Sequence, residues 1–245
     1  MFLRIIETLY GLVSLIIFGV VVFIIVCPLV ILGPTLPIRR FIGRIGVRIA
    51  LLCIGIPMRI KGLENVPDGV CVAVSNHASY IDGVVLTSAL PARFTFVVQD
   101  GAASWPYVGL VIRRMGVTFV NRSSPRQGAN QTRDLIRRVQ QGQSLAIFAE
   151  GTFVAEPGLM PFKKGAFMIA AKGGALVLPV CIRGTRRFFG SGSILPRWSP
   201  IEIEMCPAIP VNQDAAQLSD AARAAISPIC GEPDLALVAQ AGEIA

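Results

Sequence analysis

Residues 69–89, GVCVAVSNHASYIDGVVLTSA, predict a β-strand, a turn and an α-helix in direct succession. Gly69–Val74 is short and apolar, as a buried strand requires, and Ser79–Ala89 follows as a helix. The turn carries His77, and Asp82 follows at the start of the helix. Ligands bind in open α/β sheets at the edge where strands end and helices begin. This unit therefore predicts an α/β fold and the place of a site within it.

The alternation of short apolar runs with helical stretches begins near Met58 and continues along the chain. The further predicted strands are Phe94–Val98, Val117–Val120, Ser144–Phe148, Leu176–Ile182 and Ile201–Met205. The further predicted helices are Trp105–Met115, Gly128–Gln141, Lys163–Lys172 and Asp214–Ile226. Strands that alternate with helices indicate an α/β fold with a mixed, mostly parallel central sheet flanked by helices.

The N-terminal part is far more apolar than a globular core requires. No charged residue occurs from Thr8 to Ile38, and Leu12–Leu32 is almost wholly aliphatic. About 20 such residues cross a bilayer core, which predicts an N-terminal hydrophobic, membrane-associated helical segment. A signal peptide is the alternative, but its apolar stretch is shorter, and Pro28 and Gly33 interrupt this one. Because Pro28 can kink the helix, crossing of the bilayer and re-entry into one leaflet both stay open.

Positive charge follows this apolar segment, at Arg39, Arg40, Arg44 and Arg48. Such charge collects on the cytoplasmic side, so we expect the inner (cytoplasmic) membrane, with the main domain on the cytoplasmic side. Apolar residues interleave with the arginines at helical spacing, which predicts a basic amphipathic helix in the headgroup region. The expected division is a membrane anchor with this helix, an α/β domain and a C-terminal tail without a chemical pattern, at 1–57, 58–230 and 231–245.

The composition limits the classes of molecule that we expect the protein to bind. Hydrophobic residues make up 53% of the chain and charged residues 16%, and the net charge is +8. This charge suits membrane lipid or phosphate, and without a zinc-finger or RNA-binding signature we expect no nucleic-acid partner. One histidine and six scattered cysteines predict no metal site, and no cofactor is implied. The cysteines are interpreted as reduced core thiols, with a disulfide framework as the alternative.

His77 and Asp82 form the candidate catalytic pair. The carboxylate can reach back to one ring nitrogen of His77, which fixes the tautomer and leaves the other nitrogen as a general base. A packed histidine beside a capping aspartate is the alternative, and it is the better interpretation of an isolated H-x4-D pattern. Three further polar segments support catalysis, because they fall at strand-to-loop edges that can converge on one cleft.

Two of these segments carry candidate cations for substrate binding. GVTFVNR, residues 116–122, delivers Arg122 to the end of a strand, where a guanidinium can hold a phosphate. PFKKGA, residues 161–166, opens a helix with Lys163 and Lys164, and helix N-termini attract anions. A solvated surface is the alternative for all three side chains.

The third segment is FAEGT at residues 148–152. Glu150 offers a carboxylate, Gly151 a backbone that a ligand can approach closely, and Thr152 a hydroxyl. A plain turn is the alternative. A fourth apolar block, Leu178–Val180, is expected to end a buried strand and to shape a pocket.

The four blocks resemble, in this order, the motifs of the glycerol-phosphate and lysophosphatidate acyltransferases: N-H-x4-D, G-x-x-F-[IV]-x-R, F-P-E-G-T and [VL]-P-[VI]. The resemblance spans roughly residues 58–205. It implies an acyl-CoA or acyl-carrier-protein donor and a lysophospholipid acceptor, with His77 as the base and Asp82 as the residue that orients it. It also implies a set of residues that hold the phosphate of the acceptor, namely Arg122, Glu150, Gly151 and Thr152.

This chain departs from the family pattern at three positions. Ala149 replaces the usual proline, Phe153 replaces a frequent arginine, and Asn121 replaces a common aspartate. The resemblance implies acyl transfer to the free hydroxyl of lysophosphatidate, which makes phosphatidate for phospholipid synthesis. Because of Phe153, another lysophospholipid or a lyso-aminolipid is the alternative acceptor.

Two other functions compete with this one. GQSLA at residues 142–146 is a faint match to the nucleophile elbow of serine hydrolases, but Ser144 begins a predicted strand instead of ending one. A non-catalytic membrane lipid-binding protein is the second competitor, and the intact His77 and Asp82 argue against it.

Overall fold

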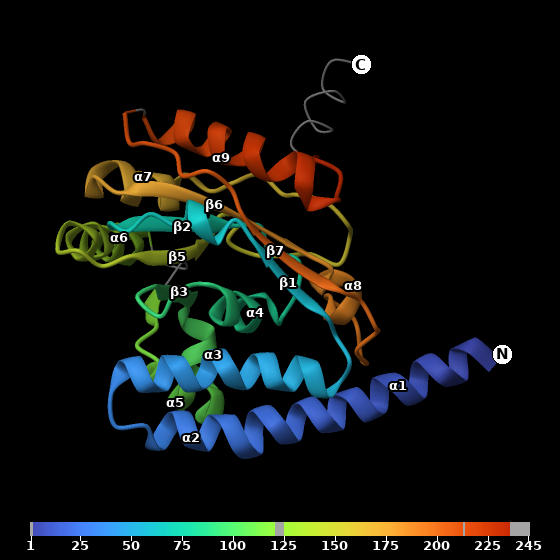
Figure 1. Ribbon diagram of the computed structural model, residues 1–245. Coiled ribbons are helices and arrows are strands. Elements are labelled where there is room, and N and C mark those ends of the chain that lie inside the picture. The colour runs from blue at the N-terminus through green and yellow to red at the C-terminus, as the bar shows by residue number, and fades with distance from the viewer. Residues whose placement is uncertain (1, 121–124, 213, 236–245) are drawn as a thin grey trace, which may run out of the picture.

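The computed structural model describes residues 2–120, 125–212 and 214–235 (Figure 1). A seven-stranded sheet lies at its centre, in the order β1-β7-β6-β2-β5-β3-β4. The strands are β1 (Met58–Lys61), β2 (Cys71–Ser75), β3 (Thr95–Gln99), β4 (Thr118–Val120), β5 (Leu145–Phe148), β6 (Leu176–Arg183) and β7 (Ile201–Met205). Neighbouring strands run parallel except β6 and β7, which are antiparallel. The predicted mixed, mostly parallel α/β fold is confirmed.

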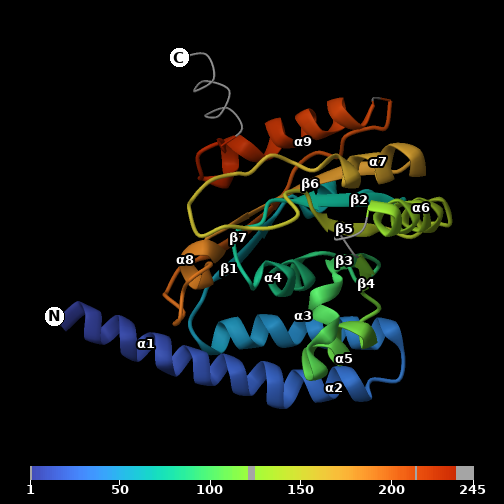
Figure 2. The same cartoon turned by 180° about the vertical axis from the view of Figure 1, so that it is seen from behind.

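Helices cover both faces of this sheet (Figures 1 and 2). One side holds α3 (Leu36–Cys53), α4 (Asp82–Ala89) and α5 (Pro106–Arg114). The other side holds α6 (Pro125–Gln140), α7 (Lys164–Gly173) and α9 (Ala215–Cys230). Each layer buries its own apolar core against the strands, and Leu86 and Phe167 are central side chains of the two cores. Burial of apolar surface on both faces is the main stabilising contribution to such a sheet.

Two short elements differ from the predictions. The edge strand β1 alternates between half-buried and exposed residues, and α8 (Thr185–Phe189) follows β6 after a left-handed glycine, Gly184, with φ 85°. The prediction that Leu178–Val180 ends a strand is wrong, because β6 continues to Arg183. Pro179 lies in the middle of β6, and its carbonyl accepts a hydrogen bond from the N–H of Cys206.

The N-terminal helix is long and continuous. It comprises α1 (Phe2–Gly19), a π-helical stretch (Val20–Val26) and α2 (Cys27–Leu32). Phe2–Leu32 is long and apolar enough to cross a membrane, and only 17% of its most apolar window is buried in the protein. The chain then turns back into α3, which packs against it. The helical irregularity precedes Pro28, whose ring nitrogen has no hydrogen to donate to the previous turn.

The arginines of α3 face the domain. Arg40 donates to the carbonyls of Met115 and Ala92 at 3.0 and 2.8 Å, and Arg48 donates twice to the carbonyl of Ser88 at 3.1 and 2.9 Å. Ser88 lies in the last turn of α4, where a cation is favourable because of the helix dipole. These side chains therefore hold the ends of helices together, and the placement of α3 in the headgroup region stays a prediction.

Candidate active site

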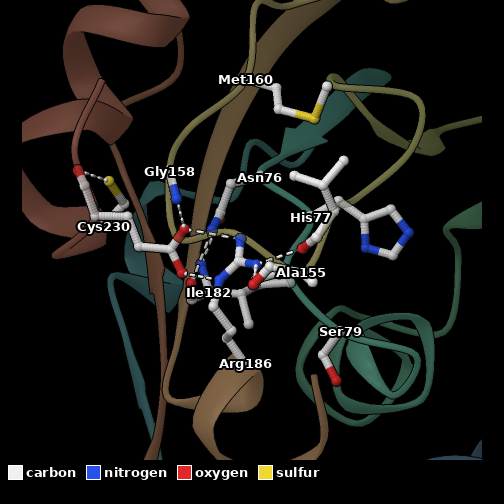
Figure 3. Close-up of polar contacts among 12 residues, drawn as sticks. Asn76, His77, Ser79, Ala155, Gly158, Met160, Ile182, Arg186 and Cys230 are labelled. Carbon is white, nitrogen blue, oxygen red and sulfur yellow. Dashed lines mark hydrogen bonds and ion pairs between the residues drawn. The ribbon is translucent and has the colours of Figure 1, made fainter. Parts of the chain in front are cut away.

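The H-x4-D turn begins where β2 ends. Ser75 of β2 lies beside Phe148 of β5 and Val180 of β6. The loops after β2 and β5 therefore leave the sheet at the same edge, whereas β6 continues to Arg183. The side chain of Asn76 extends the pairing, because it donates to the carbonyl of Ile182 at 2.9 Å and accepts from its N–H at 2.7 Å (Figure 3). The turn that carries the candidate base is thereby fixed to the middle of the sheet.

Asp82 orients His77. Its Oδ2 lies 2.9 Å from Nδ1 of His77 and also accepts the backbone N–H groups of Ala78 and Ser79 at 2.6 and 2.8 Å. Asp82 is completely buried, whereas the His77 side chain is 17% exposed. Because a carboxylate can only accept here, the neutral imidazole carries its proton on Nδ1, which leaves the lone pair on Nε2. In Figure 3 the His77 ring points away from the polar cluster around Arg186.

Aromatic side chains surround the His77 ring. Phe148 stacks on it with ring centres 4.1 Å apart, and Phe153 lies at 4.5 Å on a tilted plane. Tyr80 packs edge-on against Phe153 at 4.9 Å and is largely exposed. Phe153 is the residue that replaces the frequent arginine of the family, so the candidate base has an apolar neighbour at this position.

Glu150 links the turn to the loop that follows β5. It is buried, and its two oxygens accept the N–H groups of His77 and Met160 at 2.6 and 2.7 Å. Burial raises the pKa of Glu150 to about 7, and the charge of Glu232 adds to this effect, whereas the two N–H bonds and Arg186 oppose it. Both oxygens face backbone groups instead of an open cleft.

The other predicted site residues lie in three different settings. Gly151 adopts a left-handed φ of 76°, and it lines a pocket of about 360 Å³ together with Lys163 and Phe148. Thr152 and Lys164 are exposed. Arg122 lies outside the described residues. The structure therefore brings together His77, Asp82 and Glu150, with Gly151 next to Glu150, whereas the exposed Lys163 lines a pocket whose lining residues do not include His77.

Sequence reasoning did not identify three residues that support the site. These are Asn76, Arg186 and Glu232, which hold the turn and the loop after β5. Asn76 belongs to the N-H-x4-D motif and could have been selected on that ground. Arg186 and Glu232 stand outside all four motifs, and only the fold shows that they meet.

Ser144 has a structural role. It is buried immediately before β5, and its hydroxyl accepts the N–H of Cys71 at 3.2 Å. This position has no strand-to-helix turn, which the nucleophile elbow of a hydrolase requires. In the described part of the chain, no three His, Cys, Asp or Glu side chains form a possible metal site.

Comparisons with known proteins agree with the motifs. A sequence model of the family described as acyltransferase matches residues 57–183. The 1-acyl-sn-glycerol-3-phosphate acyltransferase BAT2, chloroplastic, of Brassica napus is 40% identical over 136 residues, which cover 55% of this chain and 39% of that protein. The 1-acyl-sn-glycerol-3-phosphate acyltransferase of Borreliella burgdorferi is 31% identical over 166 residues, which cover 67% of this chain and 66% of that protein.

These matches span less than two thirds of either relative. The fold also has a solved counterpart, the 1-acyl-sn-glycerophosphate acyltransferase PlsC from Thermotoga maritima, with a TM-score of 0.75 and 20% identity. That likeness covers 93% of this chain and 98% of the other, and it shows a shared fold. On its motifs and its match to the family model, this chain belongs to the acyltransferase family.

Proposed function

We propose that the protein moves a fatty acyl group from acyl-CoA or acyl-carrier protein to the free hydroxyl of lysophosphatidate, producing phosphatidate. The observation that carries this proposal is the contact of 2.9 Å between Nδ1 of His77 and the buried carboxylate of Asp82. The names of the curated relatives support lysophosphatidate as the acceptor.

The reaction needs one base and no covalent enzyme intermediate. Nε2 of His77 takes the proton from the acceptor hydroxyl while its oxygen attacks the thioester carbonyl. The tetrahedral intermediate then collapses, the carbon–sulfur bond breaks, and the imidazolium returns the proton to the departing thiolate. The products are the new ester and the free thiol of the donor. Asp82 stabilises the imidazolium that forms between these two steps.

The acceptor phosphate is proposed to lie near the cationic side of the pocket beside Gly151. Lys163 lines this pocket, and Thr152 and Lys164, the first residue of α7, are proposed to contribute to phosphate binding. Arg122 is proposed to contribute on the ground of its place in the family motif. Glu150 is proposed to act on the acceptor through the backbone that it holds, because its oxygens already accept two N–H groups.

The membrane arrangement is part of the same proposal. The apolar helix Phe2–Leu32 supports membrane association. We propose an anchor at residues 1–57, a catalytic domain at residues 58–230 on the cytoplasmic face of the inner membrane, and a C-terminal segment at residues 231–245. A lysolipid reaches such a site from the bilayer, whereas the donor arrives from the aqueous side.

One experiment tests the function. Purified protein in detergent or liposomes receives labelled acyl-CoA or acyl-carrier protein, with lysophosphatidate or another lysolipid as the acceptor. We expect transfer by the parent, loss of turnover in His77→Ala, and retention in Glu202→Gln, which changes an ion pair between β6 and β7. Acceptor binding without transfer from either donor would support a lipid-binding protein instead.

Phe153 favours a second candidate, transfer to a lysolipid without a phosphate monoester. Its ring contacts His77 and Tyr80 in the place of a cation, so the site has one positive charge fewer than the family pattern has. In Phe153→Arg we expect the ratio of kcat/KM for lysophosphatidate over an uncharged lysolipid to rise by about 10-fold. Phe153→Leu removes the ring without adding a charge and serves as the control. An equal change in both variants would contradict this explanation.

A further inference from the structure

A short segment after α9 runs along the loop between β5 and α7. Gly231 turns the chain with φ 71°, and residues 232–235 follow, which we call the C-terminal clasp. The N–H of Leu159 donates to the carbonyl of Pro233 at 2.8 Å, and the N–H of Leu235 donates to the carbonyl of Leu159 at 3.1 Å. The clasp therefore pairs with the loop as a strand would, although it lies outside the main sheet.

Glu232 of the clasp binds Arg186 of α8 with two hydrogen bonds, at 2.6 and 2.9 Å, and also accepts the N–H of Gly158 at 2.8 Å. Arg186 in turn donates to the carbonyls of Val154 and Ala155 at 2.5 and 3.3 Å (Figure 3). The two side chains are only 15% and 19% exposed, so water competes weakly for these bonds. One ion pair thus fixes the loop at two places, at Val154 and Ala155 and again at Gly158.

A second ion pair strengthens the attachment. Arg223 of α9 pairs with Asp234 of the clasp and donates to the carbonyls of Met160 and Leu159 at 2.6 and 2.8 Å. Its guanidinium also lies over the ring of Phe162, 5.2 Å from the centre. Figures 1 and 2 both show the long loop between the end of α9 and α8.

The loop needs this external support. Most of it has no regular secondary structure, so the loop itself supplies few backbone hydrogen bonds. It nevertheless carries two side chains that touch the candidate base. Phe153 packs on the His77 ring, and Glu150, where the loop begins, holds the N–H of His77 and that of Met160. Displacement of the loop would therefore displace the base.

We propose that Arg186 and Glu232 are positioning residues for the transfer reaction: their ion pair holds the loop 151–160, and through it Phe153 and Glu150, against the His77 turn. This inference rests on the proposed function. The competing explanation is that the ion pair only stabilises the fold. It predicts that loss of this pair affects the His77 turn no more than loss of any comparable ion pair.

The test compares Glu232→Ala with Glu202→Ala. Glu202 also binds an arginine, Arg183, at 2.5 Å, but this pair lies between β6 and β7 and does not touch the loop. Since small misplacements of reacting groups cost up to about 100-fold in rate, we expect kcat to fall by about 10- to 100-fold in Glu232→Ala. KM should change much less, and Glu202→Ala should keep the parent kcat. Glu232→Gln keeps the size of the side chain, and its kcat should lie between the values of Glu232→Ala and Glu202→Ala.

Hydrogen–deuterium exchange supplies a readout that does not depend on turnover. We expect faster exchange in Glu232→Ala at residues 151–160 and also at the N–H groups of residues 77–79, with neither change in Glu202→Ala. Unchanged exchange at residues 77–79, or a kcat equal to that of Glu202→Ala in an active parent, would overturn the positioning role. If the parent transfers no acyl group from any donor, the proposed function fails, and the exchange data still decide whether the clasp holds the His77 turn.

Discussion

Asp82 accepts three donors on one oxygen, while its second oxygen is buried without a hydrogen-bond partner in the described part of the chain. In Asp82→Asn, the amide oxygen can take the place of Oδ2, but the NH2 group is then buried and unpaired, and the negative charge is lost. We expect kcat to fall by about 10²- to 10⁴-fold. The free energy of unfolding should fall by about 1–3 kcal/mol. Steady-state kinetics and denaturant unfolding measure the two effects, and a variant with the parent's kcat would contradict the role of the carboxylate.

Glu150 links stability to pH. Its ordinary pKa of 4.5 rises to about 7 in the folded chain, chiefly through burial, with Glu232 raising it and Arg186 and the N–H groups lowering it. Between these values Glu150 binds more protons in the folded state than in the unfolded state, so the stability that it contributes is greatest below pH 4.5 and is lost as pH rises toward 7.

Glu150→Gln removes this titration. We expect the parent to lose up to about 3 kcal/mol more than the variant when pH rises from 4.5 to 8, measured by denaturant unfolding at both values. Since other groups titrate equally in both proteins, the difference isolates Glu150. Parallel curves for the two proteins would show that the carboxyl keeps its ordinary pKa.

At the scale of the elements, α3 supports the helix that carries Asp82. Arg48 donates twice to the carbonyl of Ser88 near the end of α4. We expect Arg48→Ala to lower the free energy of unfolding by about 1–2 kcal/mol. Arg59→Ala, on the exposed edge of β1, is the control. The binding of Arg48→Ala to anionic vesicles should equal that of the parent. Weaker flotation of the variant with vesicles would show that Arg48 contacts lipid headgroups.

Local signals explain which elements the sequence predicts. The strands β2 to β7 are short apolar runs between turn residues, and their predicted ends agree with the structure to within a residue or two. In contrast, β1 has two cations in four residues, and α8 has only five residues, so neither has a recognisable pattern. Both acquire their conformation from neighbours in the fold.

The same distinction applies to the candidate site. His77 and Asp82 are predictable because they lie five residues apart in one strand–turn–helix unit. Arg186 and Glu232 are separated by 46 residues and have no shared motif, so their contact depends on where β6 and α9 end. The arginines of α3 show the opposite case, because their helical spacing is correct but their partners are carbonyls of the domain.

At the scale of the whole molecule, the N-terminal helix is joined to the domain through small residues of α3. A side chain at Gly46 would clash with the buried Val26 of the N-terminal helix. We expect Gly46→Leu to force the two helices apart and to cost about 1–3 kcal/mol, seen as a lower Tm in detergent. Gly19→Leu has open space around the new side chain and should keep or raise the Tm. Equal Tm values for the two variants would mean that the helix is not docked.

The position of the clasp in the chain has a consequence for biosynthesis. A ribosome makes the apolar helix Phe2–Leu32 first, the His77 turn later, and residues 232–235 after every other element described here. The loop 151–160 cannot form its bonds to Glu232, Pro233 and Leu235 until those residues have left the exit tunnel. A nascent chain therefore possesses this apolar helix long before the loop 151–160 is secured, so the candidate site is completed only after the apolar helix has been made.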